Sequence, residues 1–102
     1  MMETREIVPC LIGHPFAPIG RGEDVRCTYR ALQAAAMQST VLDLYGANAL
    51  DPALREEFEP SLVGTPGVVN IFHLNGDEIA PAFGSLGDRL SAKAYNIIYP
   101  AW

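Results

Sequence analysis

One stretch near the N-terminus limits the possible folds of this chain more than any other. Residues 7–12 are almost all apolar, and they lead into a loop rich in glycine and proline. An amphipathic pattern begins at Glu23, directly after the loop. A buried strand, a glycine-bearing loop and a helix form the first unit of a parallel α/β domain. Glycines let the backbone approach a ligand, and N–H groups at a helix start attract phosphate or sugar oxygens.

The loop departs from the standard nucleotide-binding fingerprints. Its glycines are spaced too widely for G-x-G-x-x-G, and no Gly-Lys-Ser/Thr follows them. Glu23 and Asp24 stand at the expected helix start, where they complement the helix dipole and repel a bare phosphate. Arg21 and Arg26 partly offset these two acids. A well-capped turn that binds no ligand therefore remains an alternative to a binding loop.

The later segments alternate between strand and helix patterns. We expect strands over residues 7–12, 40–45, 68–74 and 94–99, and helices over 23–36, over 51–58 and through 79–86. The first strand is the most apolar, so it should be central, with Cys10 and Leu11 buried. This alternation predicts an α/β, Rossmann-like three-layer domain with a parallel four-stranded sheet in the order 2-1-3-4.

Size and charge exclude several classes of protein. A chain of 102 residues makes one small domain, and a net charge of −5 argues against nucleic acid as a partner. No segment reaches the roughly 18 apolar residues that span a bilayer, and acids flank Arg5 where a signal peptide would be basic. We expect a cytoplasmic chain, with peripheral contact at the inner membrane as the alternative.

The cysteines and histidines do not form a metal-binding pattern. Cys10 and Cys27 are expected to be small buried hydrophobic residues in a reducing compartment, and no Cys-x-x-Cys occurs. His14 and His73 are far apart in sequence and have no cysteine at ligand spacing. We therefore expect neither a metal site nor a cofactor.

Three segments carry a resemblance to a known family. They are GHPFAPIGRGEDVR at 13–26, VNIFHLNGDE at 69–78 and YNIIYPAW at 95–102. Together they resemble the N-terminal domain of bacterial family-four glycosyltransferases with the GT-B fold. This class includes mannosyl- and rhamnosyl-type transferases that build surface polysaccharides. The similarity extends from about Ile7 to Trp102, and the first segment is the most distinctive.

The resemblance implies two Rossmann-like domains that face each other across a cleft. The N-terminal domain of such enzymes mostly holds the acceptor, and the C-terminal domain mostly holds the nucleotide-sugar donor. Transfer retains the anomeric configuration and needs no metal. By this resemblance, Gly20 and Gly22 offer backbone N–H groups to the donor phosphate. Arg21 would make a charge-assisted contact with the diphosphate.

The same resemblance makes four residues candidates for acceptor binding, namely His14, His73, Asn75 and Asp77. A buried core position is an equally open reading of His73. A helix-start role is an open reading of Asp77 and of its neighbour Glu78. No catalytic residue can be carried over, because the loop that holds a donor-contacting histidine in many relatives begins here as Pro-Ala-Trp.

The sequence also lacks the donor domain of this family, with its paired glutamates. We therefore expect residues 1–102 to be a partial, acceptor-side domain, an N-terminal fragment that transfers no sugar alone. Its partners would be a nucleotide-sugar donor and a glycan acceptor. The alternative is a stand-alone, non-catalytic Rossmann-like binding or interaction module. In the full fold a further strand would flank residues 94–99, so self-association through that strand is expected.

Overall fold

The computed structural model describes residues 7–17, 21–44 and 51–100. Its strands are β1 (Cys10–Gly13), β2 (Thr40–Asp43), β3 (Val69–Phe72) and β4 (Tyr95–Ile98), and its α-helices are α1 (Arg21–Ala34), α2 (Pro52–Phe58) and α3 (Gly76–Leu86). All the strand pairs are parallel, and the sheet order is β2-β1-β3-β4. The predicted fold class and strand order are confirmed.

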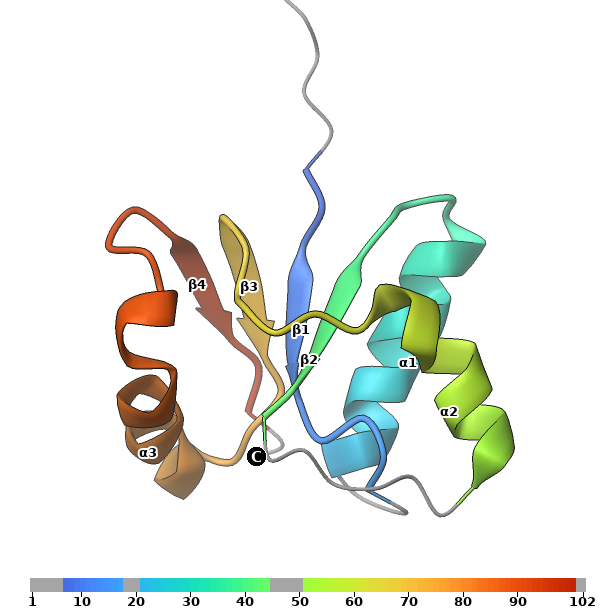
Figure 1. Ribbon diagram of the computed structural model, residues 1–102, viewed down its shortest axis with the longest axis horizontal. Helices are drawn as coiled ribbons and strands as arrows, with labels where there is room; N and C mark the ends of the chain where they lie inside the picture. The colour runs from blue at the N-terminus through green and yellow to red at the C-terminus, as the bar shows by residue number, and fades with distance from the viewer. Residues whose placement is uncertain (1–6, 18–20, 45–50, 101–102) are drawn as a thin grey trace, which may run out of the picture.

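Helices cover both faces of the sheet. Figure 1 shows α3 on one side of the strands and α1 with α2 on the other. Cys10 and Ile12 pack in the cluster that contains Ala82 and Leu86 of α3. Leu11 points the opposite way, into the cluster formed with α1 and α2. These three β1 residues have no exposed surface, which confirms that β1 is the central strand.

The first strand begins later than the apolar run predicts. Ile7 and Val8 are exposed, and β1 starts at Cys10. Pro9 has no N–H and cannot donate to a neighbouring strand, although its carbonyl accepts a hydrogen bond of 2.9 Å from the N–H of Thr40. The apolar run is therefore a strand only after its proline.

Helix α1 also ends before the predicted boundary. The sequence predicts a helix through residue 36, but Ala36 lies beyond α1, is exposed and has a φ of 58°. The N–H of Met37 donates to the carbonyl of Leu32 at 2.8 Å, which closes the helix in a Schellman-type turn. A left-handed conformation costs an alanine about 1 kcal/mol more than a glycine. The prediction failed because a cap, and not the apolar period, ends the helix.

The two cysteines have different environments. Cys10 is buried, and burial raises the pKa of its thiol. Cys27 is exposed on α1, with its Sγ 3.6 Å from Oε1 of Glu23. The expectation of two buried cysteines is therefore wrong for Cys27, which lies on the solvent side of an amphipathic helix.

The two edges of the sheet are protected differently. At the β2 edge, Val41 forms a parallel bridge with Leu62, and its carbonyl accepts a hydrogen bond of 2.9 Å from the N–H of Val63. At the other edge, no strand of the described residues lies beyond β4. Three side chains of this edge strand, Tyr95, Ile97 and Ile98, are exposed. Unpaired backbone and exposed apolar side chains there form a template for strand addition.

We predict that the chain self-associates through β4. Sedimentation at micromolar concentration should show dimers or larger species, and Ile98→Lys should return the protein to a monomer by placing a charge on the edge. Val68→Lys is the control, because Val68 is also exposed but precedes β3. A stable monomer that Ile98→Lys leaves unchanged would contradict the prediction.

Candidate functional site

The candidate site lies where the central strands end. The N–H of His73 donates to the carbonyl of Ile12 at 2.8 Å, and the N–H of Tyr99 donates to that of Phe72 at 2.9 Å. The ends of β1, β3 and β4 are thereby aligned in one row. The chain passes from β1 to β2 on one side and from β3 to β4 on the other. Ligands of open α/β sheets bind at such a switch point, at the carboxyl ends of the strands.

Gly13 ends β1 in a space that admits no side chain. A Cβ at this position would lie 2.8 Å from Cγ2 of Val25 and 3.0 Å from the carbonyl oxygen of His73. The missing side chain lets α1 and β3 approach the strand at the same point. Gly13 therefore allows close packing where the chain leaves β1 at the carboxyl end of the sheet.

Gly22 has a similar packing role at the start of α1. It is buried, and a Cβ there would lie 2.8 Å from the carbonyl oxygen of His14 and closer still to that of Ala17. The first turn of α1 fits against the loop because residue 22 has no side chain. Its predicted role as a donor of N–H groups to a phosphate stays a prediction.

Arg26 anchors the described part of the loop, residues 14–17, a role that was not predicted from the sequence. The side chain is almost fully buried, and its Nη1 donates to the carbonyls of Pro15 at 3.0 Å and Ala17 at 2.5 Å. Its Nη2 donates to Oε2 of Glu23 at 2.8 Å, and the guanidinium lowers the pKa of Glu23. A loop rich in proline and glycine leaves carbonyls without backbone partners, which is the signal that could have revealed this anchor.

His14, which directly follows β1, and Glu78, in the first turn of α3, are hydrogen-bonded through their side chains. Oε2 of Glu78 lies 3.0 Å from Nε2 of His14, and their side chains are 14% and 15% exposed. Because an ionised carboxylate only accepts, Nε2 carries the hydrogen. Oε1 of Glu78 accepts a hydrogen bond of 3.1 Å from the N–H of Asn75. Glu78 thus has the helix-start role considered from sequence and also contacts His14.

His73 is buried at the end of β3. It is 2% exposed, and neither ring nitrogen has a hydrogen-bond partner among the described residues. Its ring centroid lies 5.1 Å from that of Tyr99. Burial lowers the pKa of His73, and the nearby Asp24 carboxylate opposes this shift. A ligand could touch the imidazole only if a covering group moved, so the acceptor-binding role stays a prediction.

The remaining predicted residues occupy different positions. Asn75 is half-buried at the N-cap of α3, and Asp77 is exposed in its first turn. Arg21 begins α1, whereas Gly20 lies outside the described residues. The fold brings all four predicted acceptor residues, His14, His73, Asn75 and Asp77, to the end of the sheet at which β1 and β3 end.

The acidic side chains at this end of the sheet favour neutral ligands over phosphates. Glu23 and Asp24 occupy the first turn of α1, and Asp77 and Glu78 occupy that of α3. Glu23 is ion-paired with Arg26, and Glu78 is hydrogen-bonded to His14. The excess of acidic side chains at this end of the sheet still disfavours phosphate, whereas their carboxylate oxygens accept hydrogen bonds from the hydroxyl groups of a neutral ligand. The site is therefore suited to a polyhydroxylated molecule.

The chain matches no protein-family model, no curated protein and no solved structure. Within residues 7–17, 21–44 and 51–100, no three histidine, cysteine or acidic side chains are close enough to hold a metal ion. In this same part of the chain, no helix has the length and apolar character needed to cross a bilayer. What the site can do follows from its own geometry.

We predict that Gly22→Ala destabilises the protein by about 1–3 kcal/mol, because the new methyl group must displace backbone. Gly84→Ala is the matched control. A Cβ at Gly84 meets nothing within 4 Å, and alanine favours the interior of α3 by about 0.5–1 kcal/mol. Urea unfolding measures both free energies. Equal stability of Gly22→Ala and the wild type would show that the loop does not need this glycine.

We predict that the buried His73 makes the protein less stable at mildly acidic pH. In the unfolded chain His73 binds a proton near its ordinary pKa of about 6.5, whereas burial lowers the pKa in the folded chain. Below a pH of about 6.5 the unfolded state therefore binds more protons than the folded state. The free energy of unfolding falls as the pH decreases from this value toward the lower pKa of the folded chain.

Thermal unfolding between about pH 8 and pH 5 tests this. His73→Leu should flatten the decline, whereas His14→Gln, which keeps the buried imidazole, should retain it. A decline that is equally steep in His73→Leu would assign the effect to other groups.

Proposed function

We propose that this chain is the acceptor-side domain of a retaining, metal-independent glycosyltransferase of the family-four class with the GT-B fold. It would work with a nucleotide-sugar donor and a glycan acceptor in surface polysaccharide synthesis. Two observations support this, the parallel 2-1-3-4 sheet and the glycine-bearing loop at its switch point. The single observation that carries the proposal is the His14–Glu78 pair beside that loop.

The pair is suited to binding a sugar hydroxyl. The carboxylate of Glu78 can accept a hydrogen bond from the acceptor hydroxyl, and the His14 imidazole positions the carboxylate through Nε2. The N–H of Asn75 holds the other carboxylate oxygen. Two fixed contacts reduce the freedom that Glu78 would lose on binding, which favours a defined orientation of the acceptor.

The acidic side chains at the starts of α1 and α3 support a division of roles between two domains. Its carboxylates disfavour a diphosphate, so this domain would hold the acceptor and a facing domain would hold most of the donor. Arg21 is the residue of this chain proposed to reach the diphosphate, with Gly20 and Gly22 offering backbone N–H groups. Because groups from both domains stabilise the transition state, the 102 residues alone would bind sugar without transferring it.

We predict that mannose, rhamnose or their disaccharides shift the amide resonances of residues 13–14 and 75–78 in a labelled sample. Glu78→Gln keeps an oxygen for the N–H of Asn75 but removes the charge, and it should weaken binding by about tenfold, as expected for a charge-assisted hydrogen bond. Glu56→Gln, on the exposed side of α2, is the control.

Incubation of the same samples with nucleotide-sugars should give no turnover. The proposal fails if none of these sugars shifts residues 13–14 and 75–78, or if Glu78→Gln binds them as well as the wild type. Turnover that depends on Arg21 would overturn the division between domains.

The second candidate is a stand-alone, non-catalytic Rossmann-like binding or interaction module. It is favoured by Gly22 and Arg26, whose described roles are packing and loop anchoring. The two candidates differ in what adjoins this chain in the gene. A coding sequence beyond Trp102 that holds a second Rossmann-like domain with a Glu-x7-Glu pair would decide for the transferase.

A further inference from the structure

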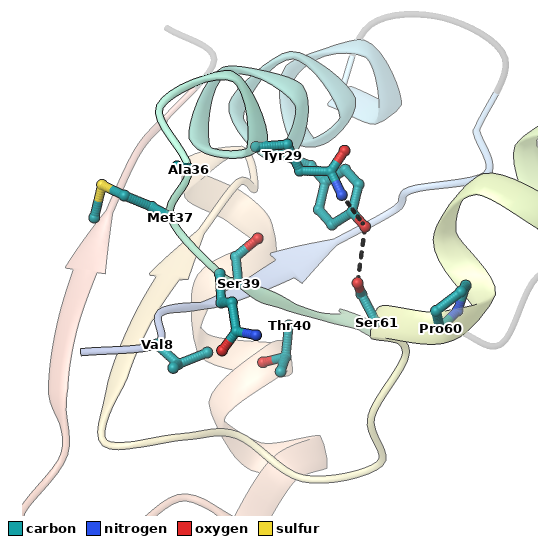
Figure 2. Close-up of a pocket in the computed structure, with 10 residues that line it drawn as sticks. Val8, Tyr29, Ala36, Met37, Ser39, Thr40, Pro60 and Ser61 are labelled. Atoms are coloured by element: carbon teal, nitrogen blue, oxygen red, sulfur yellow. Dashed lines mark hydrogen bonds between the residues drawn. The ribbon is translucent and has the colours of Figure 1, made fainter. Parts of the chain in front are cut away.

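A pocket lies at the opposite end of the sheet from the His14–Glu78 pair. It has a volume of about 730 Å³ and lies between the last turns of α1, the start of β2 and the segment after α2. In Figure 1, the last turn of α1 lies at one end of the strands, and β1 and β3 end at the opposite end. Figure 2 shows the lining side chains. This pocket is called the α1–β2 pocket below.

The polar groups of the pocket are neutral. None of its lining side chains carries a charge, and six of them bear hydroxyl or amide groups: Tyr29, Gln33, Gln38, Ser39, Thr40 and Ser61. The other lining residues are apolar. Such a wall has no cation for a phosphate, but it offers both hydrogen-bond donors and acceptors to an uncharged ligand.

Part of this polar wall is held in a fixed arrangement. Nε2 of Gln33 donates to the hydroxyl of Tyr29 at 3.0 Å, and that hydroxyl shares a hydrogen bond of 2.8 Å with Oγ of Ser61 (Figure 2). The Tyr29 ring is buried, with its centroid 4.6 Å from that of Phe58. The core therefore positions the hydroxyl, whereas the buried ring presents no open face for stacking a nucleobase.

Ser39 is the observation that points to a ligand. It is 8% exposed, and its Oγ has no hydrogen-bond partner among the described residues. A buried hydroxyl without a partner is unfavourable, and native structures rarely leave one unexplained. Serine has one side-chain torsion with three staggered positions, so its hydroxyl can turn toward a molecule in the pocket.

The adjoining backbone is also strained. Ala36 lines the pocket and holds the left-handed conformation that ends α1. This conformation belongs to the Schellman-type turn at the end of α1, which fixes the backbone beside Ser39.

We propose that the α1–β2 pocket binds a neutral sugar unit. Sugar hydroxyls match the hydroxyl and amide groups of Ser39, Gln33 and Gln38, and the apolar lining residues Val8 and Met37 can contact the C–H face of the ring. The volume is within the usual range for small-molecule pockets. This site is separate from the His14–Glu78 pair and does not rest on the proposed function.

Titration of a labelled sample with D-glucose, D-mannose or D-galactose tests the proposal. At least one sugar should shift the amides of residues 36–40 and 61, and inorganic phosphate should not. Ser39→Ala should weaken this binding by about fivefold to tenfold, the effect of losing one neutral hydrogen bond. Its thermal unfolding should be unchanged or shifted upward, because the hydroxyl lost has no partner in the protein. Ser85→Ala, exposed on α3, is the matched control.

Three results would overturn the proposal: no shift at residues 36–40 or 61 with any of these sugars, equal affinity of Ser39→Ala and the wild type, or equal shifts with phosphate. Shifts confined to residues 13–14 and 75–78 would overturn it and leave the carboxyl-edge site in place. Shifts confined to residues 36–40 and 61 would support it and contradict acceptor binding at the carboxyl edge.

Discussion

The burial of β1 on both faces is the constraint on which the rest of the structure depends. Cys10, Leu11 and Ile12 have no exposed surface, so helices must cover the sheet on both sides. β1 ends at Gly13, where a side chain would clash with Val25 and with the backbone of His73. The candidate site lies at this end of the sheet, where the central strands end.

The described part of the β1–α1 loop, residues 14–17, is held by contacts within the protein. The buried Arg26 guanidinium binds two loop carbonyls, and Gly22 lets α1 pack against the same segment. Glu78 of α3 is hydrogen-bonded to His14 of the same segment. An arrangement of this kind limits the conformational freedom lost on binding.

The two ends of the sheet offer different chemistry. The carboxyl edge has acidic helix starts and an ionisable His14–Glu78 pair, whereas the α1–β2 pocket has only neutral hydroxyl and amide groups. Charged groups discriminate among ligands by charge, and neutral groups discriminate by the geometry of hydrogen bonds. A ligand suited to both ends would be uncharged and rich in hydroxyl groups.

The sequence by itself determined the fold class. Each segment can be identified as a strand or a helix from its own apolar pattern, and the alternation of the two types predicts a parallel α/β domain. Local signals were misleading where a single residue overrode the period, as Pro9 does just before β1 and Ala36 does just after α1. Only the tertiary structure decided that His14 meets Glu78, that Arg26 is buried and that Ser39 lacks a partner. These features arise from contacts between segments far apart in the chain, and the spacing of residues within one segment does not encode them.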